Sequence, residues 1–181
     1  MEPLAHESDE GLLARFGRGE RAALAELARR YEGRLLGLAS GLLEGQGDLA
    51  ADAVQEMWVR VIRFGGTFNG KSSLKTWLYR VTINECRRVK ARAGAAQGEE
   101  ALAGAAAPVK PPLVQEEDAE VREAVRGLSA ERRIVVLLCY HRGMTHEQAA
   151  GILGLPVGTL KTRLRAAMTE LRAKLAAGAR G

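Results

Sequence analysis

The side chains best suited to binding a ligand are cations and hydroxyls near the start of one predicted helix. Lys161 and Arg163 can donate hydrogen bonds to phosphates or to guanine edges, and Thr162 can reach either. The backbone amides near 157–159 lack partners at a helix start and suit a phosphate. This is the chemistry of DNA binding, and the predicted set is Thr159, Lys161, Thr162, Arg163 and Arg165.

The elements that must position this set form a helix-turn-helix pattern. Thr145 and Gln148 predict a capping box at the start of a short helix, and Gly154 and Pro156 end that helix in a tight corner. The second helix carries an apolar stripe at steps of three and four, made of Leu160, Leu164, Ala167, Met168, Leu171 and Leu175. In such a motif the second helix enters the major groove. A helical hairpin with a solvated basic face is the alternative that spacing alone leaves open.

The distribution of charge indicates more than one contact with an acidic polymer. The chain of 181 residues has a formal net charge of +5, and its bases concentrate in 71–92 and 161–180. The segment between them, 99–123, is acidic. Two basic segments with an acidic spacer predict two separate contacts with nucleic acid.

Several other classes of function are disfavoured. Cys86 and Cys139 are too few for a disulfide framework, and Cys139, His141 and His146 lack a fourth ligand and a zinc spacing, so no metal or other cofactor is expected. No nucleophile constellation or phosphate-cradling glycine motif points to an enzyme. The N-terminus has no signal-peptide run, and no stretch is long and apolar enough to span a membrane, so we expect a cytoplasmic protein.

Helical periodicity covers most of the chain and predicts an all-α fold of two small domains. Amphipathic patterns predict helices over 9–16, 20–42, 48–64, 73–93, 116–126 and 129–140, before the helix-turn-helix. An Ala-, Gly- and Pro-rich stretch predicts a flexible linker. The expected division is a first domain over 1–93, a linker over 94–115 and a second domain over 116–181.

The fourth predicted helix combines apolar and basic faces. Trp77 and Leu78 have the spacing of core residues, whereas Tyr79 and Arg80 are expected on other faces. An exposed aromatic ring among bases is typical of binding to single-stranded nucleic acid. Core packing remains the alternative for Trp77, while Phe68 stands in a glycine-rich loop where a core position is harder to explain.

Taken in order, these motifs resemble an extracytoplasmic-function (ECF) sigma factor of the sigma-70 family. The first half is similar to region two of that family in SDEGLLARFGRGERAALAELARRYEGRLLGLA, DAVQEMWVRV and FNGKSSLKTWLYRVTINECRR. The second half is similar to region four in LSAERRIVVLLCYHRGMTHEQAAGILGLPVGTLKTRLRAAMTELR. The resemblance implies a protein that directs bacterial core RNA polymerase to promoters.

The resemblance also implies roles for individual residues. On the helix that would dock on polymerase, the matching residues are Asp52, Gln55 and Glu56. The loop that captures a flipped base of the minus-ten element matches Phe68, Asn69, Gly70 and Ser72, and Asn84 matches a polar residue that helps to read it. Further DNA contacts are predicted at Lys75, Arg87 and Arg88. Positions facing the minus-thirty-five element match Lys161, Thr162 and Arg165.

Departures from the family pattern affect only the promoter preference. Leu74-Lys75 and Cys86-Arg87-Arg88 differ from more usual residues in the minus-ten segment, and Arg165 stands where some relatives have an aromatic. The promoter sequence therefore cannot be copied from relatives.

The resemblance further implies promoter DNA as a ligand, an anti-sigma factor as a further partner, and a monomer when the protein is free. Two other functions remain open at this point. One is a conventional dimeric helix-turn-helix regulator, and the other is an RNA-binding module that uses Phe68, Trp77 and Tyr79.

Overall fold

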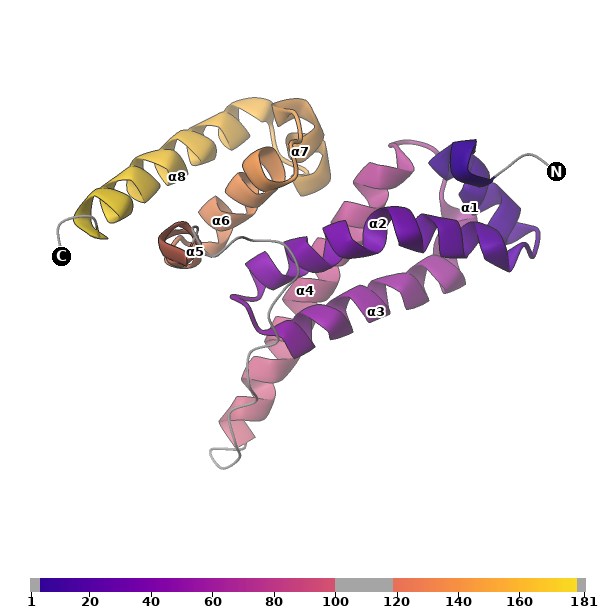
Figure 1. The fold of residues 1–181 in the computed structure, drawn as a ribbon, viewed down its shortest axis with the longest axis horizontal. Coiled ribbons are helices and arrows are strands. Elements are labelled where there is room, and N and C mark those ends of the chain that lie inside the picture. The colour runs from indigo at the N-terminus through magenta and orange to yellow at the C-terminus, as the bar shows by residue number, and fades with distance from the viewer. Residues whose placement is uncertain (1–3, 100–118, 179–181) are drawn as a thin grey trace.

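The computed structural model describes residues 4–99 and 119–178, and every regular element in these ranges is helical (Figure 1). The N-terminal half contains α1 (Asp9–Gly17), α2 (Arg21–Leu42), α3 (Gly47–Phe64) and α4 (Leu74–Glu99). The C-terminal half contains α5 (Ala119–Arg126), α6 (Ala130–Val136), α7 (His146–Leu153) and α8 (Val157–Gly178). The expected all-α class with two groups of helices is confirmed. Among the described residues no helix combines the length and apolar character needed to cross a membrane.

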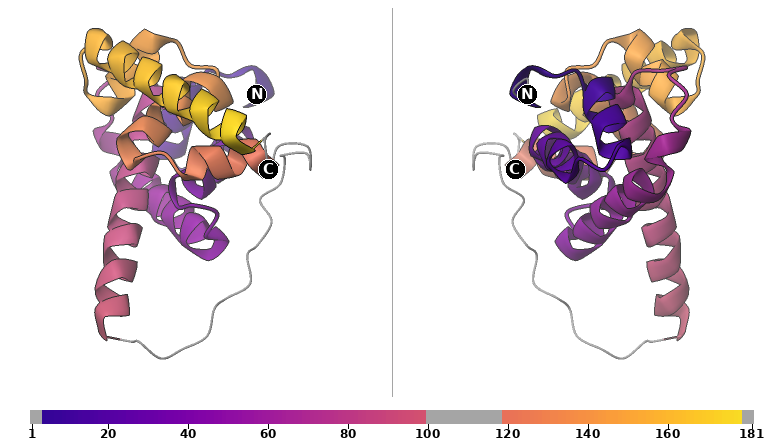
Figure 2. Two further views of the ribbon diagram at one scale, coloured as in Figure 1. Left: turned by 90° about the vertical axis from the view of Figure 1, so that its left-hand side faces the viewer. Right: turned by 90° about the vertical axis from the view of Figure 1, so that its right-hand side faces the viewer.

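The N-terminal half is a bundle in which α3 packs between α2 and α4, and α1 closes one end over α2 (Figures 1 and 2). Its core is built from the apolar stripes of these helices, because each helix must bury one face against its neighbours. The fully buried side chains include Leu12, Leu27, Leu35, Leu38, Met57, Val61, Leu74 and Leu78.

The helix α4 is longer than its sequence pattern predicts. It passes the expected end near Ala93 and continues to Glu99, so that it projects beyond the other helices (Figure 1). The added residues, 94–99, include two alanines but also two glycines, so helix propensity alone does not account for the extension. The absence of bulky residues there suggested a linker, but it is equally compatible with an exposed helix.

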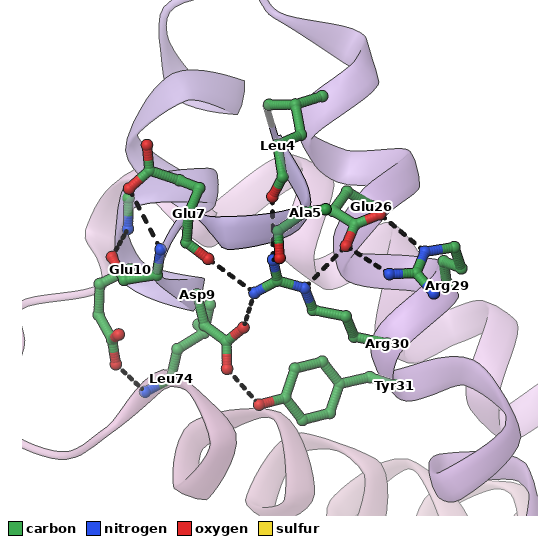
Figure 3. A network of polar contacts seen from close by, with 12 residues as sticks. Leu4, Ala5, Glu7, Asp9, Glu10, Glu26, Arg29, Arg30, Tyr31 and Leu74 are labelled. Carbon is green, nitrogen blue, oxygen red and sulfur yellow. Dashed lines mark hydrogen bonds and ion pairs between the residues drawn. The ribbon is translucent and has the colours of Figure 1, made fainter. Parts of the chain in front are cut away.

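A polar network fixes the N-terminal segment on the bundle (Figure 3). Arg30 of α2 donates to the carbonyls of Leu4, Ala5 and Glu7 at 2.8–3.0 Å and to Oδ1 of Asp9 at 2.8 Å.

The hydroxyl of Tyr31 donates to the other carboxylate oxygen of Asp9. Burial, together with this hydrogen bond, raises the pKa of Tyr31. Because the carboxylate of Glu10 accepts from the backbone N–H of Leu74 at 2.8 Å, the network also anchors the start of α4.

The C-terminal half packs α5, α6 and α7 against the long helix α8. Ser129 occupies the N-cap position of α6, as expected, but its side chain makes no capping hydrogen bond. The helix does not stay regular to Tyr140, because a π-helical turn replaces the α-helix over Leu137–His141. The two halves touch, since α6 lies against α2 and α7 lies against α4 (Figure 1).

Candidate nucleic-acid interface

The helix-turn-helix forms as its sequence predicts. The backbone N–H of Gln148 donates to Oγ1 of Thr145 at 3.2 Å, and the N–H of Thr145 donates to Oε1 of Gln148 at 3.1 Å, which completes the capping box. Gly154 ends α7 in the left-handed conformation with φ 65°. This corner requires glycine, because a Cβ would crowd the backbone at positive φ. It directs the start of α8 toward solvent.

The side chains predicted to meet duplex DNA lie on one end of α8. Lys161, Thr162 and Arg165 are exposed, whereas Leu160, Leu164, Ala167 and Leu171 are buried against the other helices. Thr159 is half-buried. Arg163 is also half-buried, and its guanidinium pairs with Glu131 of α6 at 3.2 Å. Three of the five predicted side chains are therefore available without rearrangement.

The loop before α4 presents the second group of predicted DNA contacts. Asn69 accepts from the N–H of Lys71 at 3.2 Å, which closes a tight turn, and Gly70 follows with φ 70°. Ser73 caps α4 by accepting from the N–H of Thr76 at 3.2 Å, so Ser72 is not the cap. The hydroxyl of Ser72 is thus not committed to the helix start.

An aromatic pair underlies this loop. The rings of Phe68 and Trp77 have centroids 5.8 Å apart and are tilted by 59°. Both side chains are half-buried and pack on the edge of the core, so neither the pure core reading of Trp77 nor a fully exposed ring is correct. Because both rings are only half-buried, part of this aromatic pair is accessible beside the loop, and a base can stack on an accessible ring.

Along α4 most of the predicted polar contacts are exposed, whereas the aromatic residue Tyr79 is buried. Asn84, Arg87 and Arg88 face solvent, and Lys75 is half-buried. The expectation that Tyr79 is exposed was wrong, because its side chain is only 1% exposed. The helix α4 contacts α2 and α7 as well as α3, so more than one of its faces is covered. Tyr79 is therefore not a base-stacking residue, which removes one ring from the RNA-binding alternative.

Asp52, Gln55 and Glu56 lie exposed along α3 and share one groove. Its volume is about 500 Å³, and Leu49, Val59, Val89, Arg92 and Ala93 line the rest of it. The groove combines acidic and amide groups with apolar walls from α3 and α4. Such a surface fits another protein better than nucleic acid, since its carboxylates would repel phosphates.

Sequence reasoning missed the exposure of three apolar residues of α3. Ile62 is 55% exposed, Phe64 is 49% exposed and Val59 is 38% exposed. Ile62 follows Ala50, Val54 and Trp58 at four-residue steps, so its position suggested core. Ile62 nevertheless faces solvent near the end of α3. A sequence signal for this exposure is the presence of three apolar residues close together near the end of one helix, because neighbouring helices rarely cover every side of a helix end.

No group of three or more His, Cys, Asp or Glu side chains is arranged as a metal site in the described part of the chain. Cys86 is a buried free thiol, and burial raises its pKa to about 12. Cys139 is also free and half-buried. A thiol with a pKa so far above neutrality carries little thiolate, so Cys86 is suited to packing.

Family models match both halves of the chain. Residues 27–95 match sigma-70 region 2, and residues 118–171 match sigma-70 region 4. Together these two matches cover more than half of the chain, and they occur in the order that the motifs predict. The N-terminal match is not explained by a conventional dimeric helix-turn-helix regulator, which is therefore disfavoured.

Curated relatives match along nearly the full length. The RNA polymerase sigma-H factor of Pseudomonas aeruginosa is 28% identical over 175 residues, which cover 89% of this chain and 90% of the relative. The ECF RNA polymerase sigma-E factor of Escherichia coli is 28% identical over 171 residues, which cover 87% of this chain and 88% of the relative.

Two solved structures share the fold. One is the sigma factor RpoE of Bartonella quintana in complex with the anti-sigma factor NepR, with a TM-score of 0.65, 26% identity and coverage of 78% of this chain and 89% of that chain. The other is CnrH in complex with the cytosolic domain of CnrY, with a TM-score of 0.71, 25% identity and coverage of 94% of this chain and 99% of that chain.

Proposed function

Because this chain belongs to the sigma-70 family, and within it resembles the ECF sigma factors, it is a promoter-specific initiation factor, and we propose which surface makes each contact. It binds bacterial core RNA polymerase, reads and melts the minus-ten element with its N-terminal half, and contacts the minus-thirty-five element with its C-terminal half. The protein makes and breaks no covalent bonds itself. It acts in the cytoplasm, where polymerase and promoters are found.

The polymerase contact is assigned to the groove on α3. Asp52, Gln55 and Glu56 line it together with the apolar side chains of Leu49, Val59 and Val89. A mixture of apolar and polar groups is the usual composition of a protein interface. The neighbouring exposed residues Ile62 and Phe64 extend the same helix, so the contact has room to continue toward the end of α3.

Capture of the minus-ten element is assigned to the loop 68–72 and to the exposed side of α4. A base that leaves the duplex loses stacking worth a few kcal/mol, and the aromatic edge formed by Phe68 with Trp77 offsets part of that loss. Asn84 supplies an amide that can hydrogen-bond to a base edge. Arg87 and Arg88, together with Lys75, supply the charge that follows the phosphates of the separated strand.

The minus-thirty-five contact is assigned to the start of α8. Lys161 and Arg165 are exposed cations on the helix that follows the tight corner at Gly154, and Thr162 lies between them. Side chains at this end of a recognition helix reach base edges and phosphates in the major groove. Thr159 and Arg163 complete the proposed surface, the latter after its pairing with Glu131 is exchanged for DNA.

The observation that carries this proposal is the presence, in one chain, of an interface groove, a loop with an aromatic edge and a helix-turn-helix, in the order of regions two and four. An anti-sigma factor is the further partner, since the similar sigma factor RpoE is held by one. The protein is monomeric when free, because a single copy carries both DNA contacts.

Reconstituted transcription tests the proposed function. Bacterial core polymerase mixed with the protein and fragmented genomic DNA should give transcripts from a small set of start sites that share two upstream elements. Core polymerase with the triple variant of Lys161, Thr162 and Arg165 to alanine is the matched control, and it should lose those start sites. Transcripts that are the same with and without the wild-type protein would contradict the proposal.

A further inference from the structure

The helix α1 contacts both ends of the segment that contains the proposed base-capture loop. At the start of this segment, α1 packs on the 3-10 turn Gly65–Thr67, and a Cβ added at Gly65 would lie 3.0 Å from Cδ1 of Leu13. At its end, Oε1 of Glu10 accepts a hydrogen bond from the backbone N–H of Leu74 at 2.8 Å (Figure 3). None of the proposed DNA or polymerase contacts lies on α1, so these two contacts have no role in binding itself.

The contact with Leu74 supports the least stable part of α4. The first N–H groups of a helix have no partner within it, and a first turn forms less readily than the turns that follow. In α4 the hydroxyl of Ser73 accepts from the N–H of Thr76 at 3.2 Å, and Glu10 accepts from the N–H of Leu74. The start of α4 is therefore capped in part by a side chain from a different helix.

The capped turn carries part of the proposed base-stacking surface. The N–H of Trp77 donates to the carbonyl of Ser73 at 3.1 Å, which places Trp77 at the end of the first turn. Its ring packs against that of Phe68, with centroids 5.8 Å apart. If the first turn opens, Trp77 loses the backbone position that supports this ring pair. The hydrogen bond of Glu10 is thus linked to the rings through the first turn of α4.

The helix α1 is itself well anchored, so it can act as a fixed support for the loop. Oγ of Ser8 caps it by accepting from the N–H of Gly11 at 3.0 Å, and Asp9 pairs with Arg30 of α2 at 2.8 Å. Leu13 is only 6% exposed. A loop that is held at both ends has little conformational freedom left to lose when DNA binds, and its binding groups are already in place.

We propose that Glu10 is a positioning residue for promoter melting, which holds the first turn of α4, and with it the ring pair of Phe68 and Trp77, in the arrangement that captures a minus-ten base. The inference rests on the proposed function of the loop 68–72. Glu10 makes no contact with DNA in this role, because a carboxylate is repelled by phosphates. It acts through the backbone N–H of Leu74.

Three variants separate the hydrogen bond from the loss of charge. Glu10→Ala removes the acceptor oxygen, whereas Glu10→Gln removes the same charge and keeps an oxygen that can accept. Glu32→Ala removes an exposed carboxylate from α2 and is the control for the change in net charge. Loss of a carboxylate by itself strengthens the attraction of the protein to DNA. Weaker base capture by Glu10→Ala therefore cannot result from the change in charge.

Amide hydrogen exchange of the free protein, followed by NMR, tests the positioning directly. In Glu10→Ala the amides of Leu74 and Trp77 should exchange about fivefold faster, which is the factor expected from one lost hydrogen bond. The wild type, Glu10→Gln and Glu32→Ala should exchange alike at both amides. Amides in the middle of α2 should be unchanged in all four proteins, because Glu10 is an exposed residue whose removal leaves the core intact.

Three results of the exchange measurement would overturn the proposal. The first is equal exchange at Leu74 in Glu10→Ala and the wild type. The second is equally fast exchange in Glu10→Gln and Glu10→Ala, because the hydrogen bond would then not be what holds the turn. The third is loss of protection throughout the bundle, which would show a general structural role for Glu10.

Promoter opening tests the functional consequence. Holoenzyme containing Glu10→Ala should show about fivefold lower permanganate reactivity of minus-ten thymines, while its affinity for core polymerase stays within about twofold. Glu10→Gln should restore opening. Normal opening by Glu10→Ala, despite faster exchange at Leu74, would overturn the positioning role. Absence of opening with the wild-type holoenzyme would instead contradict the proposed function, and the exchange measurement would still decide whether Glu10 holds the first turn of α4.

Discussion

At the scale of single residues, exposure decides which of the charged side chains can take part in binding. Lys161 and Arg165 extend from α8 into solvent, whereas Arg133 is buried, donates to the carbonyl of Leu128 at 3.0 Å and pairs with Glu44 at 2.9 Å. The basic composition of the chain therefore serves two purposes. Some cations hold the fold, and others remain available for phosphates.

Replacement of Lys161 by alanine should weaken promoter binding and reduce its dependence on salt. A phosphate contact releases roughly 0.9 counterion, so the slope of log K against log salt should become smaller by about 0.9. The control is Arg172→Ala, which removes an exposed cation from the distal part of α8. Anisotropy titrations over a salt series give both slopes. An unchanged slope for Lys161→Ala would mean that this side chain does not touch a phosphate.

Replacement of Asn84 by alanine should separate strand opening from polymerase binding. The side chain is exposed on α4, so its removal should not disturb the core, and affinity for core polymerase should stay within about twofold. Permanganate reactivity of thymines in the minus-ten element should fall several-fold. Parallel loss of polymerase affinity would show that Asn84 has a structural role instead.

The ion pairs of Glu44 with Lys90 and Arg133 should give a pH-dependent contribution to stability. Hydrogen bonds from Lys90 and then Arg133 lower the pKa of Glu44 from 4.5 to about 2. A lowered carboxyl pKa stabilises the folded state above pH 4.5, and this contribution disappears as the pH falls through about 2. The difference in urea midpoint between the wild type and Glu44→Gln should thus be constant from pH 7 to 5 and shrink below 4.5. A difference that persists unchanged at pH 2 would contradict this origin.

At the scale of elements, the helix-turn-helix depends on how its first helix begins and ends. The capping box at Thr145 satisfies backbone groups at the start of α7, and Gly154 turns the chain at its end. Both features are local, so they hold regardless of what the rest of the chain does. They define the corner from which α8, the proposed recognition helix, begins.

Replacement of Gly154 by alanine should destabilise the C-terminal half by about 1 kcal/mol, because φ 65° is unfavourable for a residue with a Cβ. Gly158→Ala is the matched control, since it lies within α8 with open space around it. Its stability should be unchanged or slightly raised. Urea titrations followed by circular dichroism compare the two, and equal midpoints would contradict a strained corner at Gly154.

The elements that could be predicted from the sequence are those with local causes. Ser8 caps α1 and Thr145 caps α7 through hydrogen bonds within one turn, so their starts were predictable. The burial of Tyr79 was not, because it depends on α2 and α7 packing on α4 from outside its own stripe. Likewise, the helical pattern of apolar residues predicts no role for Gly37 and Gly41. They matter only because Arg142 and Leu137 approach from a distant part of the chain.

The candidate site follows the same division. Motifs identified Asp52, Gln55 and Glu56, but not Val59 and Arg92, which complete their groove from α3 and α4. The packing of one helix on another creates that groove, so no single stretch of sequence contains it. The pairing of Arg163 with Glu131 was equally hidden, since Glu131 lies on a different helix.

At the scale of the whole molecule, the proposed function requires one chain to hold polymerase with one surface and DNA with two others. The groove on α3 carries two carboxylates beside the cation Arg92, whereas the cations proposed to contact DNA lie elsewhere on α4 and on α8. Because of this separation, the carboxylates of the groove do not pair with the cations that are proposed to bind DNA. It also lets polymerase binding and promoter binding be disrupted separately.

The most direct test of the central claim is the affinity of the purified protein for bacterial core RNA polymerase, measured by fluorescence anisotropy. The comparison is between the wild type, the double variant Gln55→Ala/Glu56→Ala and the control Glu32→Ala, which removes an exposed carboxylate from α2. We predict submicromolar binding by the wild type and the control, and a loss of at least about tenfold, or 1.4 kcal/mol, in the double variant. No binding by the folded wild-type protein, or equal binding by all three, would contradict the account.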